Sequence, residues 1–157
     1  MTSRSRTPLV GVIEAPCIVQ RRASSSYFVL PIGKVFQNRN ALITKQALPR
    51  SCKSLHVGDV FTGMVGDNKD KGLRVFAFIE FTVPQEIQTT VKFFDTQNGH
   101  GFLVFPGPGK DVYFSGSTLR RCEVQSLGTG EWVKAKYVVG PDGPEAYYIR
   151  CLGRGTR

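Results

Sequence analysis

Four ring side chains recur at short intervals in the second half of the chain. They are Phe93, His100, Phe102 and Tyr113. They fall on three neighbouring predicted strands, and rings on one face of a sheet can stack with nucleic-acid bases at about 1–3 kcal/mol each. Basic side chains that could contact phosphates at the rim are Lys92, Lys110, Arg120 and Arg121. This pattern predicts a surface for single-stranded nucleic acid.

The competing interpretation is that some of these rings belong to a protein core. Side chains alternate between the two faces of a strand, so Phe93 and Phe94 must point to opposite sides and one of them must be buried. Gly99 and Gly101 flank His100, and we expect the missing side chains to let a nucleotide approach the backbone. His100 itself is either a stacking group or a neutral polar filler.

Other chemistry finds little support in the residues present. The chain has two histidines and four cysteines, with no C-x-x-C pair, no H-E-x-x-H motif and no nucleophile elbow. Asp95 and Asp111 could hold Mg²⁺ as in a nuclease, but acids at strand ends usually form turns. We therefore expect no enzyme, no catalytic residue, no metal and no cofactor, and free thiols at the cysteines.

Charge points to a polyanionic partner. The 157 residues include 21 lysines and arginines but only 12 aspartates and glutamates, which gives a formal net charge of +9. The excess is spread over both halves rather than gathered in a polybasic arm. No apolar run reaches the roughly 18 residues of a membrane span, and the N-terminus lacks the apolar stretch of a signal peptide. We expect a cytoplasmic or nuclear protein with no membrane partner.

The elements that must position these residues are strands. Short runs of β-branched and aromatic residues alternate with Gly, Pro, Asn and Asp, and no segment keeps a helical period for three turns. The expected strands are 9–14, 27–32, 41–44, 60–65, 75–82, 89–94, 101–105, 111–114, 132–139 and 145–151. A linker is expected over 83–86, where Pro84 breaks the strand pattern.

An internal repeat supports a division at that linker. The segment 48–59 matches 119–131 at an offset of about 72 residues, and Tyr27-Phe28-Val29-Leu30-Pro31 matches Phe102-Leu103-Val104-Phe105-Pro106. Each copy has about 70 residues, the size of a small closed barrel. The sequence therefore predicts an all-β protein of two tandem five-stranded barrels, over residues 8–83 and 87–152.

The second copy resembles the cold-shock domain. The resemblance rests on Thr90-Val91-Lys92-Phe93-Phe94-Asp95, Asn98-Gly99-His100-Gly101-Phe102-Leu103, Lys110-Asp111-Val112-Tyr113-Phe114 and Gly143-Pro144-Glu145-Ala146. It covers about residues 87–152, with a degenerate copy over about 8–82. It implies barrels of the oligonucleotide-binding (OB-like) kind that bind single-stranded RNA or DNA, with Phe94 as the inward ring of the Phe93–Phe94 pair.

The chain departs from the family pattern at several positions. Phe93 replaces the usual Trp, His100 replaces a Phe or Tyr, and Asn98 replaces a Lys. The segment 111–117 also lacks the family's His and second Phe. Because these stacking groups are smaller or missing, we expect either weaker binding than on a full set of rings or a shifted ligand.

The first copy is poorer in aromatic residues and carries basic ones instead. Arg21 and Arg22 are expected to contact phosphates, with Tyr27 as a stacking ring. This copy either extends a nucleic-acid site or binds protein through residues 8–83. The function predicted overall is non-enzymatic binding of single-stranded nucleic acid, RNA more than DNA. The alternative is a protein-binding adaptor in a transcription or RNA-processing assembly.

Overall fold

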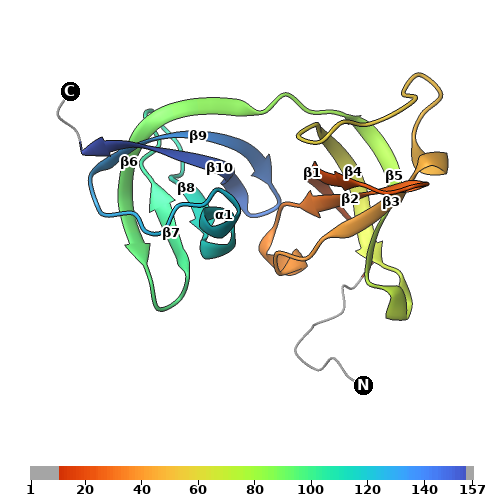
Figure 1. Ribbon diagram of the computed structural model, residues 1–157, viewed down its shortest axis with the longest axis horizontal. Coiled ribbons are helices and arrows are strands. Elements are labelled where there is room, and N and C mark those ends of the chain that lie inside the picture. Colours follow the sequence, from red (N-terminus) through yellow and green to blue (C-terminus); the bar gives the residue numbers. More distant parts are fainter. Residues whose placement is uncertain (1–10, 155–157) are drawn as a thin grey trace. The chain divides into compact units, whose positions relative to one another are not determined.

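The chain divides into two compact units after Val83, each built on a closed five-stranded barrel (Figure 1). The computed structural model describes residues 11–154. Strand order around the first barrel is β1-β2-β3-β5-β4, and around the second it is β6-β7-β8-β10-β9, so the two barrels share one topology. The predicted all-β fold of two tandem five-stranded barrels is confirmed.

The first barrel is formed by five strands and three short 3₁₀ turns. Its strands are β1 (Ile13–Arg22), β2 (Ser26–Pro31), β3 (Ala41–Thr44), β4 (Val60–Asp67) and β5 (Leu73–Phe81). The 3₁₀ turns are η1 (Lys34–Phe36), η2 (Lys45–Ala47) and η3 (Lys69–Lys71). The barrel closes where β3 and β5 run parallel, pairing Ala41 with Leu73 and Leu42 with Arg74.

The second barrel repeats this plan with a helix after its third strand. Its strands are β6 (Gln85–Asp95), β7 (His100–Leu103), β8 (Val112–Ser115), β9 (Glu131–Gly140) and β10 (Gly143–Arg154). The helix α1 (Gly116–Arg121) begins at Ser115, whose side chain accepts a hydrogen bond from the Thr118 N–H. Closure again rests on a parallel contact, Glu145 of β10 with Tyr113 of β8.

Each barrel encloses its own apolar core. Tyr27, Phe36 and Phe61 are among the fully buried side chains of the first, and Leu103, Phe114 and Ile149 of the second. Burial alternates along the strands, as in β9, where Val133, Ala135 and Tyr137 point inward. The residues between them therefore form the outer surface.

The internal repeat extends to individual hydrogen bonds. The Gly58 N–H donates to the Val19 carbonyl at 2.8 Å, and the Gly130 N–H donates to the Val91 carbonyl at 2.8 Å. Both glycines have positive φ, 96° and 88°, which L-residues with side chains avoid. These two turns close the same loop in each barrel.

Two predicted boundaries are wrong. The first strand was expected over 9–14, of which residues 9 and 10 lie outside the described part. β1 instead begins at Ile13 and continues to Arg22, because the apolar run from Ala15 to Val19 is buried. Residues 85 and 86 were expected in the linker, but both pair with β9.

Candidate nucleic-acid interface

Strands β6, β7 and β8 bring the four predicted rings together on the outside of the second barrel. Ring centroids are 5.6 Å apart for Phe93 and Phe102, 5.7 Å for Phe102 and Tyr113, and 5.9 Å for Tyr113 and His100. The Phe93 side chain is 41% exposed, and the other three are partly exposed. We call Phe93, His100, Phe102 and Tyr113 the ring cluster.

Strand register explains why these rings gather. His100 lies opposite Ser115, and Phe102 lies opposite both Phe93 on β6 and Tyr113 on β8. Cross-strand neighbours on one face lie within contact distance of each other. Burial, followed by the charge of Glu145, raises the pKa of Tyr113, so its hydroxyl stays protonated at neutral pH.

Phe94 points to the other side, as expected. Its ring packs against the second core and stacks on buried Phe114, with centroids 5.6 Å apart. The two adjacent phenylalanines are therefore divided between the surface and the core.

The expected role of Gly101 is wrong, because this glycine is buried. A Cβ atom there would overlap the Phe93 carbonyl oxygen and lie 2.6 Å from Cζ of Phe114. Gly101 thus makes room for the core ring of Phe114 rather than for a nucleotide. Gly99 has φ 69° in the β6–β7 turn, with open space around the position of a Cβ atom.

One rim cation is held by a carboxylate. Lys92 Nζ lies 2.7 Å from Asp111 Oδ2, and the other Asp111 oxygen accepts the Phe105 N–H at 3.2 Å. These hydrogen bonds, that from Lys92 first, lower the pKa of Asp111 below its usual value of 3.8. Asp111 therefore competes with phosphate for Lys92.

The second rim carboxylate shapes a turn. Asp95 accepts hydrogen bonds from the backbone and side chain of Asn98 and from the Gln97 N–H, which lower its pKa. Within residues 11–154, no three His, Cys, Asp or Glu side chains cluster as metal ligands.

The other predicted rim cations lie at α1 and in the loop before β8. Arg120 donates to Ser117 Oγ at 2.9 Å, and Arg121 donates to Thr118 Oγ1 at 2.8 Å. Burial lowers the pKa of the Arg121 guanidinium below its usual value. Lys110 is exposed, and its side chain lies near Gly143 in the β9–β10 turn.

The first barrel carries a different surface on the equivalent strands. Arg21 pairs with Phe28 as Phe93 pairs with Phe102, and its guanidinium lies 4.1 Å above the Phe28 ring. Arg22 is exposed beside it. An arginine thus covers the ring that occupies the place of Phe102.

The prediction for Tyr27 as a stacking ring is wrong. Tyr27 is fully buried, and its hydroxyl accepts the Leu55 N–H at 3.1 Å. Strand pairing makes Tyr27 the counterpart of Gly101 and Phe28 the counterpart of Phe102. The sequence match had placed Tyr27 against Phe102, and a slip of one residue exchanges the two faces of a strand.

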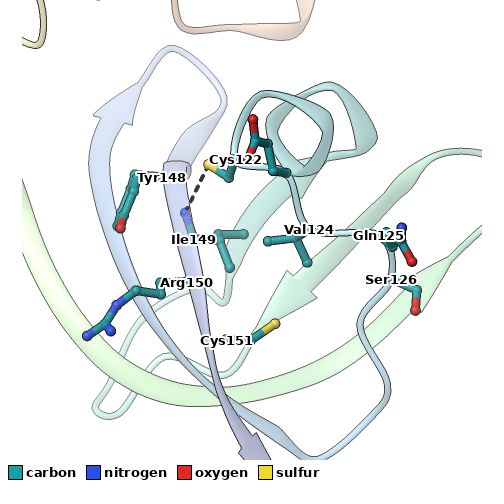
Figure 2. A pocket seen from close by; sticks show the side chains of 9 residues that line it. Cys122, Val124, Gln125, Ser126, Tyr148, Ile149, Arg150 and Cys151 are labelled. Atoms are coloured by element: carbon teal, nitrogen blue, oxygen red, sulfur yellow. Dashed lines mark hydrogen bonds between the residues drawn. The ribbon is translucent and has the colours of Figure 1, made fainter.

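Sequence reasoning did not anticipate a pocket on the second barrel. Its volume is about 520 Å³, and it lies between β10 and the segment 122–126 (Figure 2). Cys122 Sγ accepts the Ile149 N–H at 3.4 Å across a separation of 27 residues. A site assembled from a loop and a distant strand leaves no local spacing pattern in the sequence.

Known proteins that are similar to this chain in sequence belong to one family. No family model matches the chain. The cold shock-like protein CspA of Stigmatella aurantiaca is 32% identical over 63 residues, which is 40% of this chain and 93% of that protein. CspA of Bordetella pertussis is 32% identical over 62 residues, 40% of this chain and 92% of that protein.

Among solved structures, drosophila Unr CSD456 aligns with a TM-score of 0.41 and 12% identity. The alignment covers 96% of this chain and 65% of that one. In the described part of the chain, no helix is long and apolar enough to span a membrane. Because the chain covers nearly the whole length of its CspA relatives at 32% identity, it belongs to the cold-shock domain family, a non-enzymatic family that binds single-stranded nucleic acids.

Proposed function

We propose that this protein binds single-stranded nucleic acid without catalysis, by stacking bases on the ring cluster of the second barrel. The observation that carries the proposal is the ring cluster itself, four rings on three adjacent strands with neighbouring centroids 5.6–6.4 Å apart. Partly exposed rings in this arrangement add nothing to the core but offer consecutive stacking faces.

Basic groups around the ring cluster supply the phosphate contacts. Exposed Lys110 and Arg120 serve this role in the proposal, while Lys92 first has to leave Asp111. Arg121 contributes mainly by holding α1 through Thr118. With one of four nearby cations paired to a carboxylate, we expect moderate affinity and marked dependence on salt.

RNA is the proposed ligand in preference to DNA. His100 presents imidazole nitrogens at the ring cluster, next to Tyr113. Such groups can hydrogen-bond a ribose 2′-hydroxyl, which DNA lacks.

Fluorescence anisotropy with labelled RNA and DNA strands of matched sequence tests the proposal. Wild type should bind both, RNA more tightly, and the Phe93→Ala/Phe102→Ala double variant should lose at least tenfold in affinity, since about 1.4 kcal/mol corresponds to tenfold. Equal affinity of the double variant and wild type, with melting temperatures matched, overturns the stacking proposal.

A second candidate function, protein binding by the first barrel, is favoured by one observation. β5 exposes three large apolar side chains, Phe76 at 46%, Ile79 at 44% and Phe81 at 52%. Patches of apolar side chains on a folded surface commonly mark protein interaction sites. If the adaptor function holds, Phe76→Ser/Ile79→Ser should abolish pull-down of partner proteins while the affinity for oligonucleotides stays constant.

A further inference from the structure

The outer face of the β9–β10 hairpin carries a second basic and aromatic surface that the ring cluster does not use. Lys136 lies opposite Tyr148, and Lys134 lies opposite Arg150. Trp132 is on the same face of β9 by alternation and is 37% exposed. We call Trp132, Lys134, Lys136, Tyr148 and Arg150 the hairpin face.

These residues share one side of the hairpin. Figure 2 shows the side chains of Tyr148 and Arg150 on the side of β10 opposite Val124, although both residues also line the pocket. Lys136 Nζ lies 5.3 Å from the centroid of the Tyr148 ring, so cation and ring already contact each other.

Charge on the hairpin face is arranged unfavourably for the protein alone. Lys134 and Arg150 are directly opposite like charges, a cross-strand pair that destabilises a sheet. The ion pair found for Lys134 is with Glu86 at 3.7 Å, with both side chains well exposed. Such a pair contributes little to stability.

The first barrel shows that the fold does not require these cations. Strand pairing makes Thr62 and Met64 of β4 the counterparts of Lys134 and Lys136, and Ala77 and Glu80 of β5 the counterparts of Tyr148 and Arg150. None of these four is basic or aromatic, although the hairpin has the same topology. The barrel fold therefore does not depend on basic or aromatic residues at these positions.

We propose that the hairpin face is a second contact surface for the same single strand. Lys134, Lys136 and Arg150 would neutralise phosphates, and a base would stack on Trp132. This inference rests on the proposed function, because it extends the strand beyond the ring cluster on β6–β8. Charge complementarity favours phosphate as the group bound, because the hairpin face has three cations and, within residues 11–154, only one carboxylate, that of Glu86, is paired with them.

Trp132 is the only tryptophan in the chain, so all tryptophan fluorescence comes from the hairpin face. A strand of about 6 nucleotides fits within the site size of one OB fold and should bind the ring cluster without changing Trp132 emission. A strand of about 20 nucleotides should also reach the hairpin face and quench that emission. Anisotropy of the same labelled strands measures total binding in parallel.

The variant Lys136→Ala/Arg150→Ala tests the phosphate contacts. Its salt slope for the long strand should be shallower than that of wild type by about 1.4, at about 0.7 per phosphate contact. Between 50 and 200 mM salt, wild type should therefore lose about sevenfold more affinity than the variant. The short strand should show equal slopes, and Glu86→Gln should strengthen binding of the long strand.

Lys69→Ala/Lys71→Ala, on exposed η3 of the first barrel, removes the same charge elsewhere and should leave the slope for the long strand unchanged. Unquenched Trp132 with the long strand bound, or equal slopes for wild type and Lys136→Ala/Arg150→Ala, overturns the hairpin-face contact while stacking on the ring cluster stands. Failure of wild type to bind either strand overturns both proposals.

Discussion

Phe93 and Phe94 show how adjacent residues of one type take separate roles. Phe93 is 41% exposed within the ring cluster, whereas Phe94 stacks on Phe114 against the core. Replacing either ring with alanine removes the same atoms. We expect the change at Phe93 to alter the free energy of binding and the change at Phe94 to alter the free energy of unfolding.

Phe94→Ala should therefore destabilise the second barrel by about 3 kcal/mol, because it leaves a cavity beside Phe114. Phe93→Ala should change the free energy of unfolding by less than about 1 kcal/mol but weaken oligonucleotide binding by about 1–3 kcal/mol. Urea melts and anisotropy titrations of both variants check this. A loss of stability in Phe93→Ala equal to that in Phe94→Ala would place Phe93 in the core.

Asp111 holds Lys92 in an ion pair and so keeps it from contacting phosphate. Asp111→Asn should therefore strengthen oligonucleotide binding. Releasing Lys92 makes one more phosphate contact possible and should steepen the salt slope by about 0.7. Because the folded pKa of Asp111 is lowered, its contribution to stability is present at neutral pH and is lost only as the pH falls through that lowered pKa. The acid side of the pH–stability curve should therefore flatten in the variant.

Unchanged affinity and slope in Asp111→Asn would show that Lys92 does not contact the strand. Lys92→Ala is the matched control, since in that background Asp111→Asn should no longer affect binding.

At the scale of elements, α1 ends in a strained turn. The Glu123 N–H donates to the Arg120 carbonyl and the Val124 N–H to the Leu119 carbonyl, which is the Schellman arrangement. Glu123 has φ 60°, a conformation that favours glycine. Glu123→Gly should raise stability by about 1 kcal/mol in a denaturant melt.

Glu123→Ala controls for the lost carboxylate, since alanine retains the strain and should bring no stabilisation. A gain in Glu123→Ala equal to that in Glu123→Gly would assign the effect to charge instead of conformation.

The elements show what a sequence pattern can and cannot predict. Strands such as 41–44 follow from short apolar runs between turn residues, and nine of the ten strands overlap most of an expected run, whereas β1 shares only residues 13 and 14 with its expected run. Inward Phe94 followed from alternation together with the family resemblance. Tyr27 did not follow, because the repeat was matched one residue out of step, with Tyr27 against Phe102 instead of Gly101. Only tertiary contacts with Leu55 and the core fix which face is buried.

Glycine roles are equally dependent on tertiary structure. Gly101 and Gly99 look alike in the sequence, but Gly101 faces the Phe114 ring and Gly99 faces open space. The pocket beside β10 and the hairpin face likewise join residues far apart in the chain, so no local motif marks them.

At the scale of the whole molecule, the repeat keeps one topology and changes its surfaces. Arg21 over Phe28 replaces the Phe93–Phe102 pair, so the first barrel offers a cation where the second offers a ring. The composition gives the net charge of +9, and the internal repeat predicted the two barrels. The division of roles between the barrels was not.

If the first barrel contributes phosphate contacts, Arg21→Ala/Arg22→Ala should make the salt slope for a strand of about 20 nucleotides shallower by about 1.4. Binding of a strand of about 6 nucleotides to the second barrel should not change. An unaltered slope with the long strand would favour protein binding as the role of the first barrel.

The most direct test of the central claim is a nuclear magnetic resonance titration that follows aromatic side-chain signals as a short single-stranded RNA is added. Stacking predicts saturable shifts at Phe93, His100, Phe102 and Tyr113, with signals of buried Phe61 in the first core unmoved. Unmoved signals from all four rings while the RNA binds elsewhere would contradict the account.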